Sequence, residues 1–474
     1  MFVGRASELS ELGEQLRSRT PSLTVVRGVP GVGVTRFLKE ALSGLPHLVF
    51  PVPHLPDEAI RALLRHDLLR GPRGGPSPGD PGGDLPDWPG LLALATRWAP
   101  PPAPDAGPPF TLVLDDAHRL LGRGAVPGLL RKAMDDLLPR AIPFHLVLAG
   151  TSPPGMATLA GEGEAPVGEP ELDIQLRPLT VAEAVHFLPR WPAADRFAAW
   201  AVLGGHPGRL SLVPRRGTLA LVIQRMILDP EGPLHHEGFR ILERAFQAPA
   251  RYGAVLAAVS AGAESWGAMG NALPGEMGGA RLGPYVRGLE EQGLLRGESA
   301  LDARPGSRSR RYAIPDPFVR FWFGAVLPRM GRLATRGAPL VWEEEVRPAM
   351  DAHVAGVLPE AARLWLQHDA APHLGAVARE AGALWGAEHD LQVVGILRNG
   401  GVVYGQCIWR EEPLGEAELE VLDSQVRRVR YGIGREARHR LLFGRGAATP
   451  GLRSRQARDS MVRVVGVREL LGEG

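Results

Sequence analysis

The first third of the chain alternates short apolar runs with amphipathic stretches. SLTVV at 22–26 leads into a glycine-rich turn, and TRFLKEAL at 35–42 follows with the spacing of a helix. Three further runs have the composition of buried strands: HLVFPVP at 47–53, FTLVLDD at 110–116 and FHLVLAGTSP at 144–153. Strands that alternate with helices predict an α/β fold with a parallel sheet.

The pattern becomes helical from 179 to about 250. LTVAEAVHFL at 179–188 opens with a capping box, in which Thr180 precedes Glu183 by three positions. The glycines and proline of GGHPG at 204–208 interrupt the helical pattern. This stretch predicts a helical segment that follows the sheet.

Residues 251–314 predict three helices and then a hairpin. The third helix is RLGPYVRGLEEQGLL at 281–295, and the strand-like pieces LLRGES and RRYAI flank the loop ALDARPGSRS. This order is that of a winged helix-turn-helix. A dense aromatic cluster, PDPFVRFWFGAVL, follows at 315–327.

The last third predicts a helix and a meander over 359–409, with a hairpin turn at Asn399–Gly400. Two earlier segments, 71–90 and 99–109, are rich in proline and glycine. Their composition predicts flexible insertions.

Composition narrows the class of protein. The 474 residues suggest two to four domains, and 44% hydrophobic residues are enough to bury several cores. The single cysteine, Cys407, excludes an internal disulfide framework and fits a reducing compartment. The sequence has neither an apolar run of membrane-spanning length nor a signal-peptide pattern at its start. We therefore expect a cytoplasmic protein without a membrane span.

The basic residues are almost all arginine. Of 54 basic residues only Lys39 and Lys132 are lysine, and the net charge is +2. Together with 60 glycines and 45 prolines, this bias points to a GC-rich genome. Compositional drift would replace a lysine by arginine and keep its charge.

GVPGVGVT at 28–35 matches the phosphate-binding pattern G-x-x-x-x-G-K-[ST] except at the lysine, where Val34 stands. Drift toward arginine does not explain an uncharged residue there. Arg27 and Arg36 are close in sequence, although neither has the spacing of the missing lysine. The candidate nucleotide-binding residues are Gly28, Gly31, Gly33, Val34, Thr35 and Arg36. Residual binding of ADP or ATP, a vestigial loop and true hydrolysis all remain open.

Several stretches in order resemble one family. They are FVGRASELSEL, GVPGVGVT, LVLDDAH, LVLAGTS, LGGHPGRL, RYAIPDPFVRFWF, and AGALWGAEHDLQVVG with GQCIWR. The chain is similar to archaeal-type P-loop ATPases of the STAND/AAA-related group, which carry a winged helix and a C-terminal domain like PD-(D/E)xK nucleases. The resemblance implies four domains: a P-loop ATPase-like core (1–178), a helical lid (179–250), a winged helix (251–327) and an α/β, restriction-endonuclease-like domain (328–474).

The resemblance also assigns the acids of the nucleotide site. Asp115 and Asp116 stand at the Walker B position, where Asp116 replaces a more common glutamate. Thr35 and Asp115 would hold Mg²⁺ if ATP or ADP binds. Without the lysine, catalysis should suffer more than binding, because phosphoryl transfer depends on neutralising the transferred group.

In the nuclease-like domain, the resemblance places the helix acid at Glu360 and the strand acid at Asp390. The E-x-K triplet falls on Gln406, Cys407 and Ile408. A neutral glutamine and an isoleucine supply neither a strong metal ligand nor a cation. We expect this centre, like the P-loop, to be degenerate.

Two clusters of arginines suggest a polyanionic partner. The expected wing carries Arg304, Arg308, Arg310 and Arg311. Residues 427–463 hold eleven arginines against two acids, Glu436 and Asp459, and Arg427, Arg428 and Arg430 open this stretch. Residues 401–423 are acidic. The alternative to a polyanionic partner is that this acidic stretch pairs with the arginine-rich stretch 427–463.

These features predict a DNA-binding protein built on an ATPase scaffold whose two catalytic centres are degenerate. Double-stranded DNA is the expected partner, with ADP or ATP and Mg²⁺ in a structural or regulatory pocket. An active STAND-type ATPase switch and a protein-interaction scaffold without DNA binding are the alternatives. The sequence is compatible with an oligomer and does not specify one.

Overall fold

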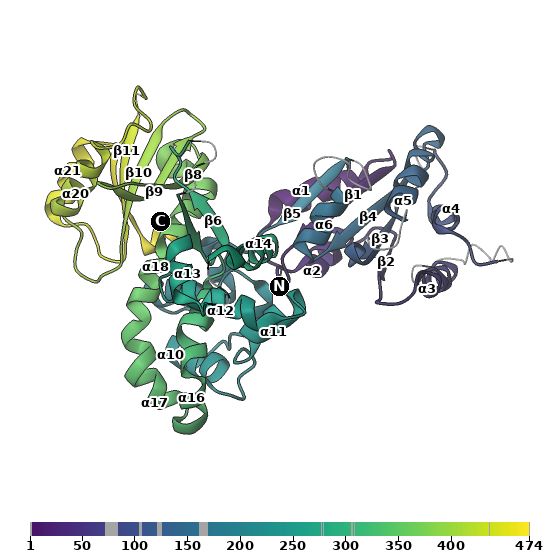
Figure 1. Ribbon diagram of the computed structural model, residues 1–474. Helices are drawn as coiled ribbons and strands as arrows, with labels where there is room; N and C mark the ends of the chain where they lie inside the picture. The colour runs from purple at the N-terminus through teal and green to yellow at the C-terminus, as the bar shows by residue number, and fades with distance from the viewer. Residues whose placement is uncertain are drawn as a thin grey trace. The chain divides into compact units, whose positions relative to one another are not determined.

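A computed structural model of the chain describes residues 2–71, 84–103, 107–120, 126–160, 169–275, 277, 279–304, 307, 309–435 and 437–473 (Figure 1). The chain forms two compact units, Met1–Pro178 and Leu179–Gly474. Parts of both expected proline- and glycine-rich insertions, 72–83 and 104–106, lie outside the described residues.

The first unit is built on a five-stranded sheet in the order β2-β3-β4-β1-β5, in which every neighbouring pair is parallel. Its strands are β1 Ser22–Gly28, β2 His47–Pro51, β3 Phe110–Asp115, β4 Phe144–Gly150 and β5 Leu172–Leu176. The central strands are buried along their length, as the apolar runs predict. The α/β fold with a parallel sheet is confirmed.

Helices cover both faces of this sheet (Figure 1). They are α1 Ala6–Arg17, α2 Val34–Ala41, α3 Asp57–Arg70, α4 Trp88–Ala95, α5 Val126–Asp135 and α6 Pro153–Ala160. Leu16 of α1 and Phe37 of α2 share a core with one face of the sheet, and α3 to α6 pack on the other. The loop from β1 to α2 follows the carboxyl end of β1. It therefore lies at the edge of the sheet where open α/β sheets bind ligands.

The second unit begins with short helices. They are α7 Val181–Ala184, α8 Ala193–Leu203, α9 Pro207–Leu210, α10 Leu219–Ile223, α11 Glu237–Ala245, α12 Pro249–Ser260, α13 Trp266–Ala272, α14 Gly283–Glu291, α15 Pro317–Phe321, α16 Met330–Arg336, α17 Ala338–Val341, α18 Met350–His368 and α19 Ala371–Leu374. The predicted capping box is present, because Thr180 N donates to Glu183 Oε2 and Glu183 N donates to Thr180 Oγ1. Among the described residues of this unit, π-helical turns lie at Gln224–Leu228, Trp322–Val326 and Trp342–Val346.

Helices α12 to α14 are followed by an antiparallel hairpin of β6 Arg296–Ser299 and β7 Arg310–Ala313. This is the expected order of elements, and its assignment as a winged helix remains a prediction. The hairpin packs on the sheet that follows it. Leu301 N donates to Ala383 O at 3.0 Å, and a Cβ at Gly382 would lie 2.9 Å from the Leu301 side chain.

The unit ends in a five-stranded mixed sheet, ordered β12-β11-β10-β9-β8. Its elements are β8 Ala378–Trp385, β9 Asp390–Leu397, β10 Val402–Ile408, α20 Glu416–Val426, β11 Arg438–Gly444, α21 Pro450–Arg458, β12 Val462–Gly466 and α22 Val467–Leu470. Strands β8 to β10 form the predicted antiparallel meander, and Gly400 in its turn has a φ of 92°. Helices α18 and α20 share cores with opposite faces of the sheet.

Across the residues that the structure describes, every helix is too short or too polar to cross a lipid bilayer.

Candidate functional site

The loop between β1 and α2 has the backbone that its glycines predict. Gly31 and Gly33 have φ angles of 82° and 94°, in the left-handed region that favours glycine. At Gly28 a Cβ would lie 2.5 Å from Val32 Cγ1, so a side chain there would clash. Gly33 is the N-cap of α2, so the loop presents backbone N–H groups at the start of this helix.

The structure brings two of the predicted site residues together at this loop. Thr35 Oγ1 donates to Asp115 Oδ2 at 3.1 Å. The second predicted acid, Asp116, does not take part in this contact. Its Oδ2 pairs with Arg119 Nη2 at 3.0 Å. Asp116 has a φ of 57°, which is uncommon for a residue with a side chain and marks a constrained end of β3. Asp115 is therefore the acid that faces α2.

Val34 stands where the pattern has lysine, and its apolar side chain cannot make the polar contacts of a lysine. Its side chain is 1% exposed and belongs to the core with Phe37 and Val26. A buried arginine, Arg5, contacts the loop directly, because its Nη2 donates to the Val32 backbone oxygen at 2.5 Å. The two arginines next to the loop in sequence pair with acids. Arg27 contacts Asp173 at 3.0 and 2.7 Å, and Arg36 pairs with Glu40, one turn further along α2 and away from the loop.

The predicted nuclease-like residues are not gathered into one site. Glu360 on α18 accepts two hydrogen bonds from Arg296, at 3.0 and 2.6 Å, and Asp390 on β9 accepts one from Arg311 at 2.9 Å. Gln406 on β10 lies 3.5 Å from the Gln392 side chain. Within the described ranges, no group of three or more His, Cys, Asp or Glu residues could hold a metal ion.

Sequence reasoning missed the charged cluster that surrounds Glu360. Arg363 of α18 donates to Glu298 of β6 at 3.0 Å and to the backbone oxygen of Gln392 at 3.0 Å, and Arg296 pairs with Glu298 at 2.6 Å. Burial alone would raise the pKa of Glu360, but Arg296 and Arg363 outweigh it and hold this pKa below its ordinary value. The carboxylate thus belongs to a cluster that joins the hairpin to α18.

Gln392 was missed as the neighbour of Gln406. Its side-chain oxygen accepts from Cys407 N at 3.0 Å, across the strand pair. The sequence contained a signal for this residue. Gln392 lies two residues after Asp390 on a predicted strand, and alternate residues of a strand share a face. Gln392 and Gln406 are both neutral, so neither is a strong ligand for a metal ion.

Two of the four predicted wing arginines contact other parts of the chain. Arg310 Nη2 donates to Gly297 O at 2.6 Å and to Glu290 at 3.1 Å. The Arg311 guanidinium, besides its bond to Asp390, lies 4.7 Å from the centre of the Trp385 ring. Arg304 is exposed, and Arg308 lies outside the described residues. The hairpin therefore uses Arg310 and Arg311 for its own packing.

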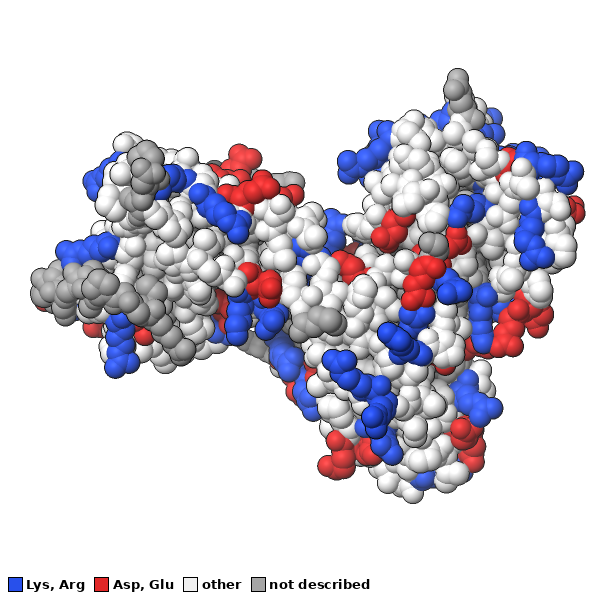
Figure 2. All heavy atoms as spheres, turned by 180° about the vertical axis from the view of Figure 1, so that it is seen from behind, with Lys and Arg blue, Asp and Glu red and all other residues white. Residues whose placement is uncertain are grey.

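The arginine-rich stretch is only partly available to a partner. Arg440 pairs with Asp423 at 3.0 Å, and Arg445 pairs with Glu411. Both pairs agree with the alternative that the acidic stretch 401–423 pairs with the arginine-rich stretch. The three arginines that open the arginine-rich stretch, Arg427, Arg428 and Arg430, are all exposed, although Arg428 Nη1 also donates to the Glu388 backbone oxygen at 2.7 Å. On the face shown in Figure 2, basic side chains lie between acidic ones rather than in one continuous patch.

The two stretches LGGHPGRL and RYAIPDPFVRFWF meet through a buried ion pair. Arg209 Nη2 contacts Asp316 Oδ2 at 2.6 Å, and its guanidinium lies 4.4 Å from the centre of the Phe318 ring. Burial would raise the pKa of Asp316, but Arg209 and His206 outweigh it and keep this pKa below its usual value. Asp316 also caps α15 by accepting from Phe318 N.

No protein-family model matches the chain, and neither does any curated protein. Among solved structures it is similar to a Walker-type ATPase of Pyrococcus abyssi, with 18% identity over 68% of this chain and 96% of that one and a TM-score of 0.50. The ORC2 protein of Aeropyrum pernix matches with 12% identity over 70% and 95% of the two chains, at a TM-score of 0.42. A STAND protein of Pyrococcus horikoshii with a tetratricopeptide repeat sensor matches with 16% identity over 77% and 50%, at 0.29. The first of these likenesses shows that about two thirds of the chain shares the fold of that Walker-type ATPase.

Proposed function

We propose that this protein binds ADP or ATP with Mg²⁺ at the loop of residues 28–35 and hydrolyses ATP slowly or not at all. The observation that carries the proposal is the 3.1 Å contact between Thr35 and Asp115 at the start of α2. These two side chains offer the oxygen ligands that Mg²⁺ prefers.

Phosphate binding would depend on the backbone N–H groups of the 28–35 loop. N–H groups at the start of a helix bind phosphate through hydrogen bonds and the positive end of the helix dipole. These donors do not depend on the side chain at position 34. When bound, Mg²⁺ would neutralise charge on the phosphate oxygens, and Thr35 and Asp115 are the residues that would hold it.

The weak-hydrolysis part rests on two missing contributions. Val34 places no positive charge at the lysine position, and Arg27 and Arg36 pair with Asp173 and Glu40 instead. The guanidinium of Arg5 donates to the backbone oxygen of Val32. Asp116 pairs with Arg119 and does not orient its carboxylate toward Thr35. Transfer of a phosphoryl group needs both charge neutralisation and a positioned water.

We expect ADP to bind the purified protein saturably with Mg²⁺ and ATP turnover to stay near background. Thr35→Ala should weaken binding about tenfold in the presence of Mg²⁺ and much less in EDTA, because only the metal contact is lost. Calorimetric titration measures both effects. Thr20→Ala, at an exposed threonine of the same unit, is the matched control and should change neither. Robust turnover that Asp115→Asn abolishes would instead favour the active ATPase switch.

Duplex DNA is the second candidate ligand, supported by the exposed arginines Arg427, Arg428 and Arg430 just after α20. Each phosphate contact contributes about 0.9 to the slope of log affinity against log salt. Arg427→Ala with Arg428→Ala should therefore lower this slope by about two, whatever the DNA sequence.

Fluorescence anisotropy over a salt series measures that slope. Arg215→Ala with Arg216→Ala removes an adjacent exposed pair elsewhere and is the matched control. Because Arg310 and Arg311 are engaged within the chain, changing them should affect stability more than the slope. A protein without DNA affinity at low salt would favour the interaction scaffold.

A further inference from the structure

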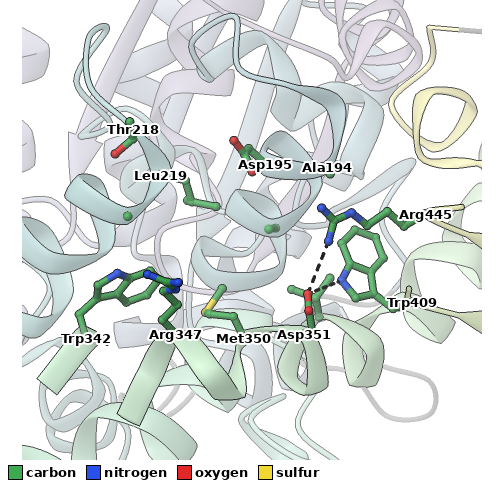
Figure 3. A pocket seen from close by; sticks show the side chains of 13 residues that line it. Ala194, Asp195, Thr218, Leu219, Trp342, Arg347, Met350, Asp351, Trp409 and Arg445 are labelled. Carbon is green, nitrogen blue, oxygen red and sulfur yellow. Dashed lines mark hydrogen bonds and ion pairs between the residues drawn. The ribbon is translucent and has the colours of Figure 1, made fainter. Parts of the chain in front are cut away.

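A pocket of about 460 Å³ opens in the second unit, among the residues shown in Figure 3. Its walls come from the start of α8, the start of α10, the segment from Trp342 to the first turns of α18, and the residues just after β10 and β11. It contains none of the residues proposed above to bind nucleotide or DNA. Its volume lies in the range of small-molecule sites, roughly 300–1,000 Å³.

Two carboxylates face the opening from different helices. Asp195 lies in the first turn of α8 and Asp351 in the first turn of α18, each near the positive end of its helix dipole. In the part of the chain that the structure describes, the Asp195 carboxylate has no hydrogen-bond or ion-pair partner. Asp351 accepts from Trp409 Nε1 at 3.0 Å and is 75% exposed.

The two cations of the lining are already compensated. Arg347 pairs with Glu343 at 2.5 Å, and Arg445 pairs with Glu411. Arg445 is 3.7 Å from Asp351, a longer contact than its pairing with Glu411. Among the described residues, Asp195 is therefore the lining carboxylate without a counterion, and Asp351 has only the longer contact to Arg445, which it shares with Glu411.

Apolar surface lies between these charges. Trp342 and Trp409 stand at opposite ends of the opening in Figure 3, with Met350 between them. Trp409 stacks on Phe197, with ring centres 5.1 Å apart, which holds its indole N–H toward Asp351. Trp342 begins a π-helical turn, a local irregularity that is frequent at functional sites.

We infer that this pocket binds an organic cation with an apolar stem, an aliphatic amine of the polyamine class. Its ammonium groups contact Asp195 and Asp351, and its methylene chain lies along Met350 and Trp342. An indole face attracts an ammonium group as well as methylene groups, so both parts of such a ligand are recognised. The pocket does not depend on the nucleotide loop, since all of its residues belong to the second unit.

Titration of the full chain with spermidine at physiological salt, followed by calorimetry, tests the inference. We expect saturable binding, and Asp195→Asn should weaken it at least tenfold because a charged partner is lost. Trp342→Leu should also weaken it. Asp302→Asn, at an exposed acid outside the pocket, is the matched control and should leave the affinity unchanged.

Pentane-1,5-diol supplies an apolar stem without charge and should not bind measurably. The inference is overturned if spermidine shows no saturation, if the diol binds as tightly, or if Asp195→Asn and Asp302→Asn weaken binding equally. The last result would indicate a general attraction of polyamines to surface acids. If Trp342→Leu fails to fold, Asp351→Asn takes its place with the same expected direction.

Discussion

Replacing Asp316 by asparagine is expected to lower the free energy of unfolding of the second unit by about 3–5 kcal/mol. Asparagine keeps an oxygen that can accept from Phe318 N, so the cap of α15 survives. The negative charge of residue 316 is lost, and Arg209 is left buried without its counterion. Arg209 and Asp316 side chains are only 9% and 13% exposed, so water compensates little.

Urea unfolding followed by tryptophan fluorescence measures this loss, because eight of the ten tryptophans lie in residues 179–474. Glu344→Gln is the matched control, since its two bonds to Arg336 are 2.7 and 3.0 Å but both side chains are nearly half exposed. Its cost should stay below about 1 kcal/mol. Equal costs for the two variants would contradict the buried-pair argument.

The same ion pair has a defined pH dependence. The pKa of Asp316 is lower in the folded chain than the ordinary value of about 3.9. The stabilisation is therefore complete above that ordinary value and is lost as the pH falls through the lower, folded-state pKa. The difference between the native protein and Asp316→Asn should accordingly shrink only in strong acid.

Val34→Lys is expected to tighten the binding of Mg²⁺-ATP about tenfold to hundredfold, the range of one hydrogen bond to a charged group. The lysine would supply a positive charge at the position where the P-loop pattern has one, while Thr35 and Asp115 already stand in contact. The change also removes a side chain that is 1% exposed in the core, so some stability should be lost.

Val34→Gln separates these effects, because glutamine is also long and polar but carries no charge. Calorimetric titration of both variants should show the gain in affinity only for lysine, and circular dichroism should confirm that both are folded. If neither variant gains affinity, the loop is a vestigial turn rather than a phosphate site.

Local patterns predicted the parts of the fold that depend on local physics. The buried runs of β3 and β4 have the composition that a parallel sheet requires, and the Thr180–Glu183 box acts within one helical turn. The Asn399–Gly400 turn likewise follows from the left-handed backbone that glycine tolerates. Each of these features is determined by residues that are close in sequence.

The environment of the candidate sites could not be predicted in this way. Arg27 pairs with Asp173 across 146 positions, and Arg296 pairs with Glu360 across 64. A cluster of arginines in the sequence therefore did not reveal which of them the fold would use for its own ion pairs. The pocket beside Asp195 was missed for the same reason, because its lining residues come from distant segments.

The packing of the β6–β7 hairpin has a consequence for how the chain folds during synthesis. The hairpin leaves the ribosome before its partners, since Arg296 must wait 64 positions for Glu360 and Arg311 must wait 79 for Asp390. At about 5–20 residues per second, this delay lasts several seconds. Until then Leu301, Arg296 and Arg311 have no docking surface, so the nascent hairpin stays undocked while the following 64 to 79 residues are made. A ribosome that stalls between α16 and β9 would leave that surface exposed.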